Sequence, residues 1–514
     1  MTYLIAKRSI LSILLFFSSY LPLSAQQLVT SNEMMERLVN GETSFENLTI
    51  SISFESTPYD RIELDRGVTF TNCTFEYLVL ENIISTGSMT FRDCKFLDGF
   101  GLTDFTSLQV SNCQFDRFEI INSSFAYDAV IEKSSFTPVM EASLLISNSV
   151  GPSLRIDSVS VHGLYVFDNQ IDSYEFMNSK FKSIERVNPV LNDPVFLTHL
   201  HVQQEQIERL DIINNVFHTP ENDWKPTFLK LNTYAENLNL SNNRVEVEVD
   251  LRNLVVNNQF LIEENTFNKR LLLGKTTFSE VYNIVPFEQL QGNKISLVKE
   301  FGGNNPVYND RRIEILNQDS INLSVAPDYL RLLRVYQNLL DIYKQSGDLN
   351  SWNLAYKEKK QLETKRLRYQ YKEAPTFESF FKWRLNQFVL LFSDFGTNPA
   401  KAVKISFYII LMFSFVYFFF PSDWDKESKA QMLTLFKNKF SKGKEEQRSF
   451  LYLVKLLLLS IVNSLTLSVN AFTTLGFGSI PTTGFPRYVA VFQGFIGWFL
   501  LSIFTVALIN QVLF

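Results

Sequence analysis

The chain has 514 residues, enough for two or three folding units, and a formal net charge of −6 from 48 basic and 54 acidic residues. The basic residues are not gathered into a stripe interleaved with aromatic residues, so the composition argues against a nucleic-acid partner. The first 25 residues and about the last 110 are strongly apolar, whereas the middle alternates apolar and polar residues. We therefore expect a soluble domain between membrane-directed ends.

Residues 1–25 have the order of a secretory signal peptide. Lys7 and Arg8 precede an apolar run from Ile10 to Phe17, and small residues ending at Ala25 come just before Gln26. The run is short for a membrane span. An uncleaved anchor is the alternative, and both interpretations place the following residues outside the cytoplasm.

A six-residue unit repeats in the middle of the chain. Phe70–Phe75, Phe91–Phe96 and Val110–Phe115 each hold Asn or Asp followed by Cys, and they begin 21 and 19 residues apart. Looser copies are Ile120–Phe125, Ile131–Phe136, Phe176–Phe181, Leu240–Val245 and Ile262–Phe267. A period near 20 predicts a solenoid, in which each coil buries its apolar residues by stacking on its neighbours.

The chemistry of the unit favours β-coils. Asn and Asp tolerate the left-handed backbone of a tight corner, and a small inward residue leaves room for stacked aromatic rings. Cys73, Cys94 and Cys113 fall at this inward position, so we assign them to the repeat and not to a disulfide framework. Residues 26–300 are thus predicted to contain a right-handed β-helix, an all-β solenoid that resembles a degenerate pentapeptide-repeat protein.

Few residues of this solenoid suggest chemistry. The repeats carry no dense run of Asp or Glu of the kind that β-helical polysaccharide lyases need, so we expect no enzyme activity and no cofactor. His199 and His201 could point to one face of a strand as a metal pair. No third ligand is near in sequence, and solvated histidines are the favoured interpretation.

Residues 301–400 are predicted to form a helical connector. From Pro327, apolar residues recur at helical spacing until Gly347 and Asp348 interrupt them. A second, charge-rich helix is expected from Trp352 to about Tyr371. The simplest interpretation is an α-helical hairpin with an apolar seam.

Residues 401–514 are predicted to be an all-α transmembrane domain, which makes the chain multidomain. Ile405–Phe420 is long and apolar enough to span a bilayer. The chain is again uncharged from Leu456 to Pro486 and from Tyr488 to Phe514.

The uncharged stretch contains Thr-Thr-Leu-Gly-Phe-Gly, followed by Pro481, Arg487 and an apolar segment with Gly494 and Gly497. This order resembles the pore loop of the two-transmembrane potassium channel family, and the pore loop is placed at 456–481. The resemblance implies a selectivity filter made of Thr474, Leu475, Gly476, Phe477 and Gly478. It implies pore support by Thr473, Ser479 and Pro481. Gly494 and Gly497 are expected to act as an inner-helix hinge or to allow close helix packing.

A filter needs consecutive backbone carbonyls that replace the hydration shell of the ion. Gly476 and Gly478 supply the backbone angles that turn these carbonyls inward together. One loop cannot encircle an ion, so the resemblance implies a homotetramer in membrane lipid that conducts monovalent cations such as K⁺. Ser479 stands where the family commonly has Asp, which bears on conductance and selectivity. The alternative function is a membrane-anchored extracytoplasmic binding or adhesin β-helix protein with a non-conducting, pore-like anchor.

The predicted signal peptide places the β-helix outside the cytoplasm of a bacterial inner membrane, whereas the resembled family has a cytoplasmic N-terminus. Three crossings would reconcile the two, with the seven Lys or Arg residues between Lys426 and Arg448 in the cytoplasm. The fit is tight, because Ser449–Thr473 has 25 residues. A span of about 20 residues followed by a pore helix of about three turns needs more than about 30.

Overall fold

A computed structural model describes residues 26–51, 62–76, 78–80, 83–102, 105–137, 144–182, 198–218, 227–301, 312–420, 446–473 and 484–512, with a few residues between 429 and 437. The chain divides into two compact units. The first comprises residues up to 322 together with 327–335, and the second comprises 323–326 and 336–514. The predicted signal peptide, residues 1–25, lies outside the described residues.

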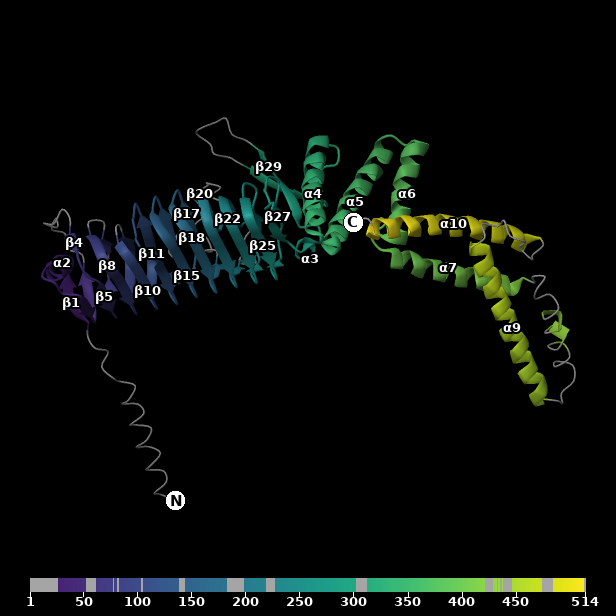
Figure 1. Cartoon of the computed structure of the whole chain (residues 1–514), viewed down its shortest axis with the longest axis horizontal. Coiled ribbons are helices and arrows are strands. Elements are labelled where there is room, and N and C mark those ends of the chain that lie inside the picture. The colour runs from purple at the N-terminus through teal and green to yellow at the C-terminus, as the bar shows by residue number, and fades with distance from the viewer. Residues whose placement is uncertain are drawn as a thin grey trace, which may run out of the picture. The chain divides into compact units, whose positions relative to one another are not determined.

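The first unit is a β-solenoid (Figure 1). The strands of its first part are β1 (Gln27–Thr30), β2 (Ser44–Glu46), β3 (Leu48–Ser51), β4 (Ile62–Leu64), β5 (Val68–Thr71), β6 (Thr74–Phe75), β7 (Leu78–Leu80), β8 (Ile83–Arg92), β9 (Lys95–Leu102), β10 (Phe105–Ser111), β11 (Gln114–Ile121), β12 (Ala129–Glu132), β13 (Ser135–Phe136), β14 (Leu144–Ser147) and β15 (Val150–Asp157). Those of its second part are β16 (Ser160–Val161), β17 (Leu164–Phe167), β18 (Gln170–Met177), β19 (Lys180–Lys182), β20 (Thr198–Ile213), β21 (Val216–His218), β22 (Phe228–Ser241), β23 (Arg244–Val245), β24 (Glu248–Asp250), β25 (Val255–Glu263), β26 (Thr266–Phe267), β27 (Leu271–Leu272), β28 (Tyr282–Ile284), β29 (Ile295–Phe301) and β30 (Arg312–Asn317).

Parallel strand pairs connect each coil to the next. One ladder joins equivalent buried residues of seven strands in the order Val110, Ile131, Ile156, Phe176, Ile212, Leu240 and Ile262. A second ladder stacks phenylalanine rings 4.5–5.2 Å apart, in the order Phe75, Phe96, Phe115 and Phe136. Each fully buried Phe contributes roughly 1.5–3 kcal/mol by leaving water. The predicted β-helix is therefore confirmed.

The corners have the predicted backbone. Asn72, Asp93 and Asn112 have φ of 52°, 54° and 53°, in the left-handed region that Asn and Asp enter at least cost among residues other than Gly. The residue after each corner points inward, and Cys73, Cys94 and Cys113 are buried free thiols. A narrow side chain here lets the aromatic rings on both sides stack.

Asn replaces Cys at the inward corner position in the later coils. The Asn243 amide donates to the Ile212 carbonyl (2.8 Å), and its side-chain oxygen accepts from the Asn215 backbone N–H (2.8 Å). Asn265 in turn accepts from the Asn243 backbone N–H (2.9 Å). All three side chains are buried. The bonds satisfy corner donors that burial would otherwise leave unpaired.

Helices and a hairpin flank the stack of coils. At its beginning, α2 (Ser31–Val39) packs on β1, β3 and β4 and buries Met34 and Leu38. Near its end lies α3 (Phe287–Leu290), and β29 and β30 then pair antiparallel, unlike the other named strand pairs. The β-structure thus runs to Asn317, beyond the boundary at 300 expected from the sequence.

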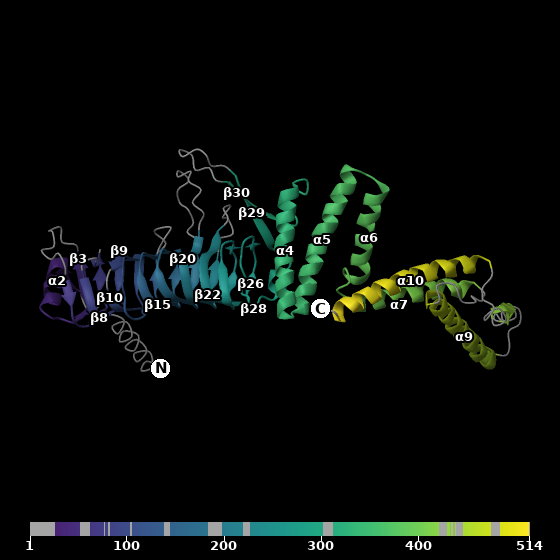
Figure 2. The same ribbon diagram turned by 45° about the horizontal axis from the view of Figure 1, so that its top comes forward.

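The following helices are α4 (Ala326–Ser346), α5 (Leu349–Glu373) and α6 (Phe377–Ser393). Gly347 (φ 70°) ends α4 as predicted, and the Tyr336 hydroxyl donates to the buried Glu358 carboxylate of α5 over 3.0 Å. A third connector helix, α6, was not predicted. It lies antiparallel beside α5 (Figure 2).

Candidate functional site

Three helices of the second unit are long and apolar enough to cross a membrane. They are α7 (Pro399–Phe419), residues Leu451–Thr473 of α9 (Glu446–Thr473) and α10 (Phe485–Val512). The sequence predicts a crossing followed by a separate pore helix between 449 and 473. The structure instead has one continuous helix of 28 residues, α9.

Helices α7 and α10 are antiparallel neighbours. At one end, the Gln511 amide of α10 donates to the Thr397 carbonyl, just before α7 (3.2 Å). At the other end, the rings of Phe420 and Phe485 lie 5.7 Å apart. The ends of the two helices therefore lie at the same two levels.

The C-terminal end of α9 lies against the middle of this pair. The Ser468 hydroxyl donates to the Ile410 carbonyl of α7 over 2.7 Å. The Phe472 carbonyl lies so close to Gly497 of α10 that a Cβ there would be 2.1 Å from the oxygen. Gly497 is 12 residues after Phe485 and 15 before Val512. Helix α9 thus ends about halfway along α10.

A buried hydrogen-bond network joins the three helices at this point. The Tyr417 hydroxyl donates to the Gln493 side-chain oxygen (2.8 Å). The Gln493 amide donates to the Ser468 carbonyl (3.0 Å) and hydroxyl oxygen (2.8 Å). All three side chains are at most 1% exposed. Polar groups among apolar helices are costly unless they are paired, so the network favours one position of α9.

Small residues allow this close approach. Ser460, Ser464, Ser468 and Ala471 follow one another at helical spacing on α9, and all are buried. Such residues let helix backbones come close in membranes. Phe413, Tyr417, Leu467 and Ala490 pack around the contact in one apolar cluster.

The predicted site residues are only partly covered by the structure. Thr474, Leu475, Gly476, Phe477, Gly478, Ser479 and Pro481 lie outside the described residues. Thr473 is the last residue of α9, and its hydroxyl donates within the helix to the Val469 carbonyl over 2.9 Å. Gly494 and Gly497 lie buried within the continuous helix α10. Gly497 is a point of close helix contact.

Sequence reasoning missed Tyr417, Ser468 and Gln493. One signal was present, because Gln493 is a polar residue within an uncharged stretch, next to Gly494. Its partners depend on tertiary structure and have no signature in the sequence.

A second polar junction ties this site to the connector. Asp394, in the turn between α6 and α7, lies 3.1 Å from the Lys357 ammonium of α5 and 2.9 Å from that of Lys401. The Gln511 amide also approaches Asn353 of α5 at 3.4 Å. The end of α10, the α6–α7 turn and α5 therefore meet at one place.

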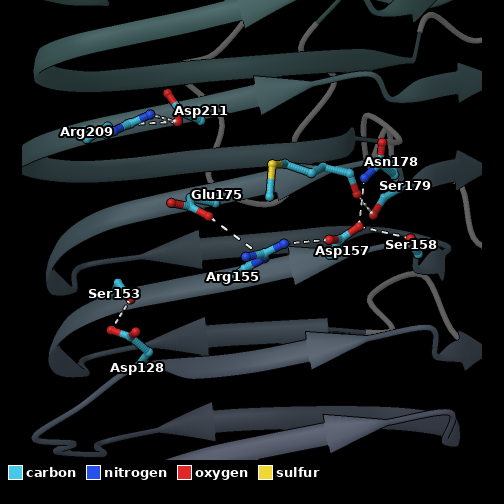
Figure 3. A network of polar contacts seen from close by, with 11 residues as sticks. Asp128, Ser153, Arg155, Asp157, Ser158, Glu175, Asn178, Ser179, Arg209 and Asp211 are labelled. Carbon is cyan, nitrogen blue, oxygen red and sulfur yellow. Dashed lines mark hydrogen bonds and ion pairs between the residues drawn. The ribbon is translucent and has the colours of Figure 1, made fainter.

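On the solenoid, charged side chains pair with one another. Arg155 lies 2.8 Å from Asp157 and 3.9 Å from Glu175, and Asn178 donates to Asp157 over 2.9 Å (Figure 3). Burial favours the neutral form of Asp157, but the bonds from Asn178, Arg155 and Ser158 outweigh it and lower the pKa. These internal pairs are a structural feature of the coils.

The histidine pair gains no support as a metal site. Within the described part of the chain, no group of three or more His, Cys, Asp and Glu side chains could hold a metal ion. Burial lowers the pKa of His201 to about 4, and the ring lies edge-on to Phe167 at 4.8 Å. His201 is thus partly buried and packs against Phe167, whereas the side chain of His199 lies outside the described residues.

No family model, curated protein or solved structure matches this chain.

Proposed function

We propose that the chain is a cation channel of the potassium-channel type, with α7, α9 and α10 of four copies surrounding one pore. The β-helix serves as its regulatory or binding domain. The observation that carries this proposal is the end of α9 at Thr473, opposite the middle of α10. The Thr-Leu-Gly-Phe-Gly stretch follows Thr473 directly in the sequence.

The spacing of the described ends suits a re-entrant loop. The level of Gly497 is about 18 Å from the start of α10, at 1.5 Å per residue. Ten residues separate Thr473 from Gly484. An extended chain covers about 3.3 Å per residue, so ten residues are enough for the return. Such a path would place backbone carbonyls in the half of the membrane nearer Phe485.

The electrostatics of α9 favour a cation. The C-terminal end of a helix carries about half a negative charge, because its last carbonyls lack intrahelical partners. Here that end points toward the start of the proposed filter. Nonhelical backbone at membrane depth is tolerated when it lines a cavity, which supports assembly of four copies around the loop.

We further propose that α7 and α10 cross the membrane completely and that α9 enters it from the side of Phe420 and Phe485. The order of residues 1–25 and the seven basic residues between Lys426 and Arg448 favour an extracytoplasmic β-helix at a bacterial inner membrane. In this orientation the filter mouth opens toward the loop that holds those basic residues.

Recording from the purified full-length chain in planar bilayers, under opposed K⁺ and Na⁺ gradients, tests the proposal. The parent is expected to pass K⁺, and Gly476→Ala is expected to lose flux or selectivity because a Cβ restricts the backbone that turns the carbonyls inward. Gly274→Ala is the matched control, since a Cβ at Gly274 meets nothing within 4 Å. Equal K⁺ flux in the Gly476→Ala chain, or no current from the parent, would leave the anchored binding or adhesin protein as the function.

A further inference from the structure

The first half of α6 carries an apolar face that no described residue covers. The side chains of Phe377 and Phe381 are 81% and 54% exposed, and their rings stack on each other at 6.2 Å. Leu391, farther along the helix, is 58% exposed. Large contiguous exposed apolar patches usually mark a protein or membrane interaction surface.

These residues share one face of the helix. Phe377, Phe381, Arg384, Phe388 and Leu391 are separated by 4, 3, 4 and 3 residues. At 3.6 residues per turn, this spacing keeps them in one stripe. The stripe is therefore a continuous surface along α6.

The later part of this face already touches a membrane helix. The ring of Phe388 lies 5.1 Å from that of Phe499 on α10, and Phe392 packs with Phe472 and Leu500. Next to this contact, the surface of α10 is itself apolar and open, since Phe495 and Trp498 are 63% and 49% exposed. The contact between Phe388 and Phe499 therefore joins the open apolar surface of α10 to the open apolar face of α6.

Cationic groups lie on and near the same half of α6, since Arg384 is itself a member of the stripe. The guanidinium of Arg384 lies 4.4 Å from the centre of the Trp383 ring, and that of Arg368 on α5 lies 5.9 Å from it. Between Lys365 and Arg384 there are six basic residues and two acidic ones, Glu373 and Glu378. Amphipathic helices with aromatic residues on one face and basic residues beside it lie in the boundary between headgroups and acyl chains.

We propose that the N-terminal half of α6 is an interfacial membrane anchor. Phe377 and Phe381 enter the outer acyl chains, and Arg368 and Arg384 bind the phosphates of anionic lipid headgroups. The anchor rests on the proposed membrane crossing of α7 and α10 and not on conduction. The anchor can therefore fail while currents persist, and currents can fail while the anchor is found.

A spin label at position 381 tests the anchor in the full-length chain reconstituted into phosphatidylcholine membranes with and without phosphatidylglycerol. The native cysteines are buried, so the label reports the introduced one. With Phe381→Cys, we expect greater access to oxygen than to a water-soluble nickel reagent, at a depth of about 5–10 Å. The matched control is Asn386→Cys, five residues on and about opposite on the helix, where the nickel reagent should have greater access.

Phosphatidylglycerol should deepen the label at position 381. The double variant Arg368→Gln, Arg384→Gln should remove this dependence, because it removes the charge that binds the phosphates. Equal nickel access at positions 381 and 386 would overturn the anchor. Shielding from both reagents, with broadening between labels, would show that a second copy covers this face and would overturn the lipid assignment. If the label at position 381 lies at the same depth in both membranes, anionic headgroups do not bind this half of α6.

Discussion

The side chain of Gln493 and the hydroxyl group of Tyr417 share a 2.8 Å hydrogen bond where three apolar helices meet. Gln493 also donates to Ser468, so one amide connects α7, α9 and α10. The network holds the end of α9, which directly precedes the proposed filter in the sequence.

Removal of the Ser468 hydroxyl is therefore expected to destabilise the helical unit. Ser468→Ala loses the bond to the Ile410 carbonyl and one bond from Gln493, at about 0.6–1.7 kcal/mol for each hydrogen bond between membrane helices. Thermal unfolding in detergent, followed by helical circular dichroism, measures the effect. Ser502→Ala is the control, because the exposed Ser502 bonds within its own helix to the Trp498 carbonyl. Equal melting temperatures for the two variants would contradict a role for the network.

Gly497→Ala is expected to displace α9. The new Cβ would lie 2.1 Å from the Phe472 carbonyl oxygen, which belongs to backbone and cannot rotate away. Overpacking of this kind costs about 1–3 kcal/mol. The melting temperature should fall and K⁺ flux should change in the Gly497→Ala chain, while Gly274→Ala leaves both as in the parent. A K⁺ flux equal to that of the parent would show that this helix contact does not determine the position of the filter.

The repeat illustrates how much of the fold the sequence predicts. Asn72 and Asp93 occupy left-handed corners, and Cys73 and Cys94 point inward. Each coil repeats the same short sequence pattern. Local chemistry of this kind does not depend on distant partners. The interval between coils is not constant, since the equivalent corners at Asn178 and Asn214 are 36 residues apart.

The candidate site was less accessible to the same reasoning. Uncharged length predicts apolar helices but not where one helix meets another, so the end of α9 halfway along α10 had no local signal. Helix α6 was not predicted, although Phe377, Phe381 and Phe388 recur at helical spacing. The Thr-Leu-Gly-Phe-Gly stretch lies outside the described residues and stays a prediction.

Asn243→Ala tests the buried amide ladder of the solenoid. The substitution removes the bond to the Ile212 carbonyl and the acceptor of the Asn215 backbone N–H, and an unpaired buried donor costs about 1–3 kcal/mol. Denaturant unfolding of the full-length chain, followed by β-sheet circular dichroism, should show a lower midpoint. Asn258→Ala, which removes an exposed bond to Asn237, should leave the midpoint near that of the parent. A similar decrease of the unfolding midpoint in both variants would show that burial of the amide ladder adds nothing to the stability of the solenoid.

His201 gives the solenoid a pH dependence. Burial lowers its pKa to about 4, below the ordinary value of 6.5, so between these values the unfolded chain binds a proton that the folded chain does not. Stability contributed by neutral His201 is therefore complete above about pH 6.5 and is lost as pH falls toward 4. The unfolding midpoint of the full-length chain should rise across this window, and His201→Gln should reduce the slope. An unchanged slope would show that His201 is as solvated in the folded state as in the unfolded one.

The proposed mouth of the filter is tested by charge at position 479. Ser479→Asp places a carboxylate next to Gly478, and four such charges around one axis would raise the local cation concentration and the K⁺ conductance. Ser479→Asn is the matched control, because it has nearly the same shape without the charge. The gain should be largest at about 0.01 M salt, where the screening length is about 30 Å, and should shrink at about 0.15 M, where it is about 8 Å. Single-channel recording at both salt concentrations measures this dependence. If the Ser479→Asp and Ser479→Asn chains conduct equally at low salt, position 479 does not face the ion path. It then does not mark the outer end of the filter.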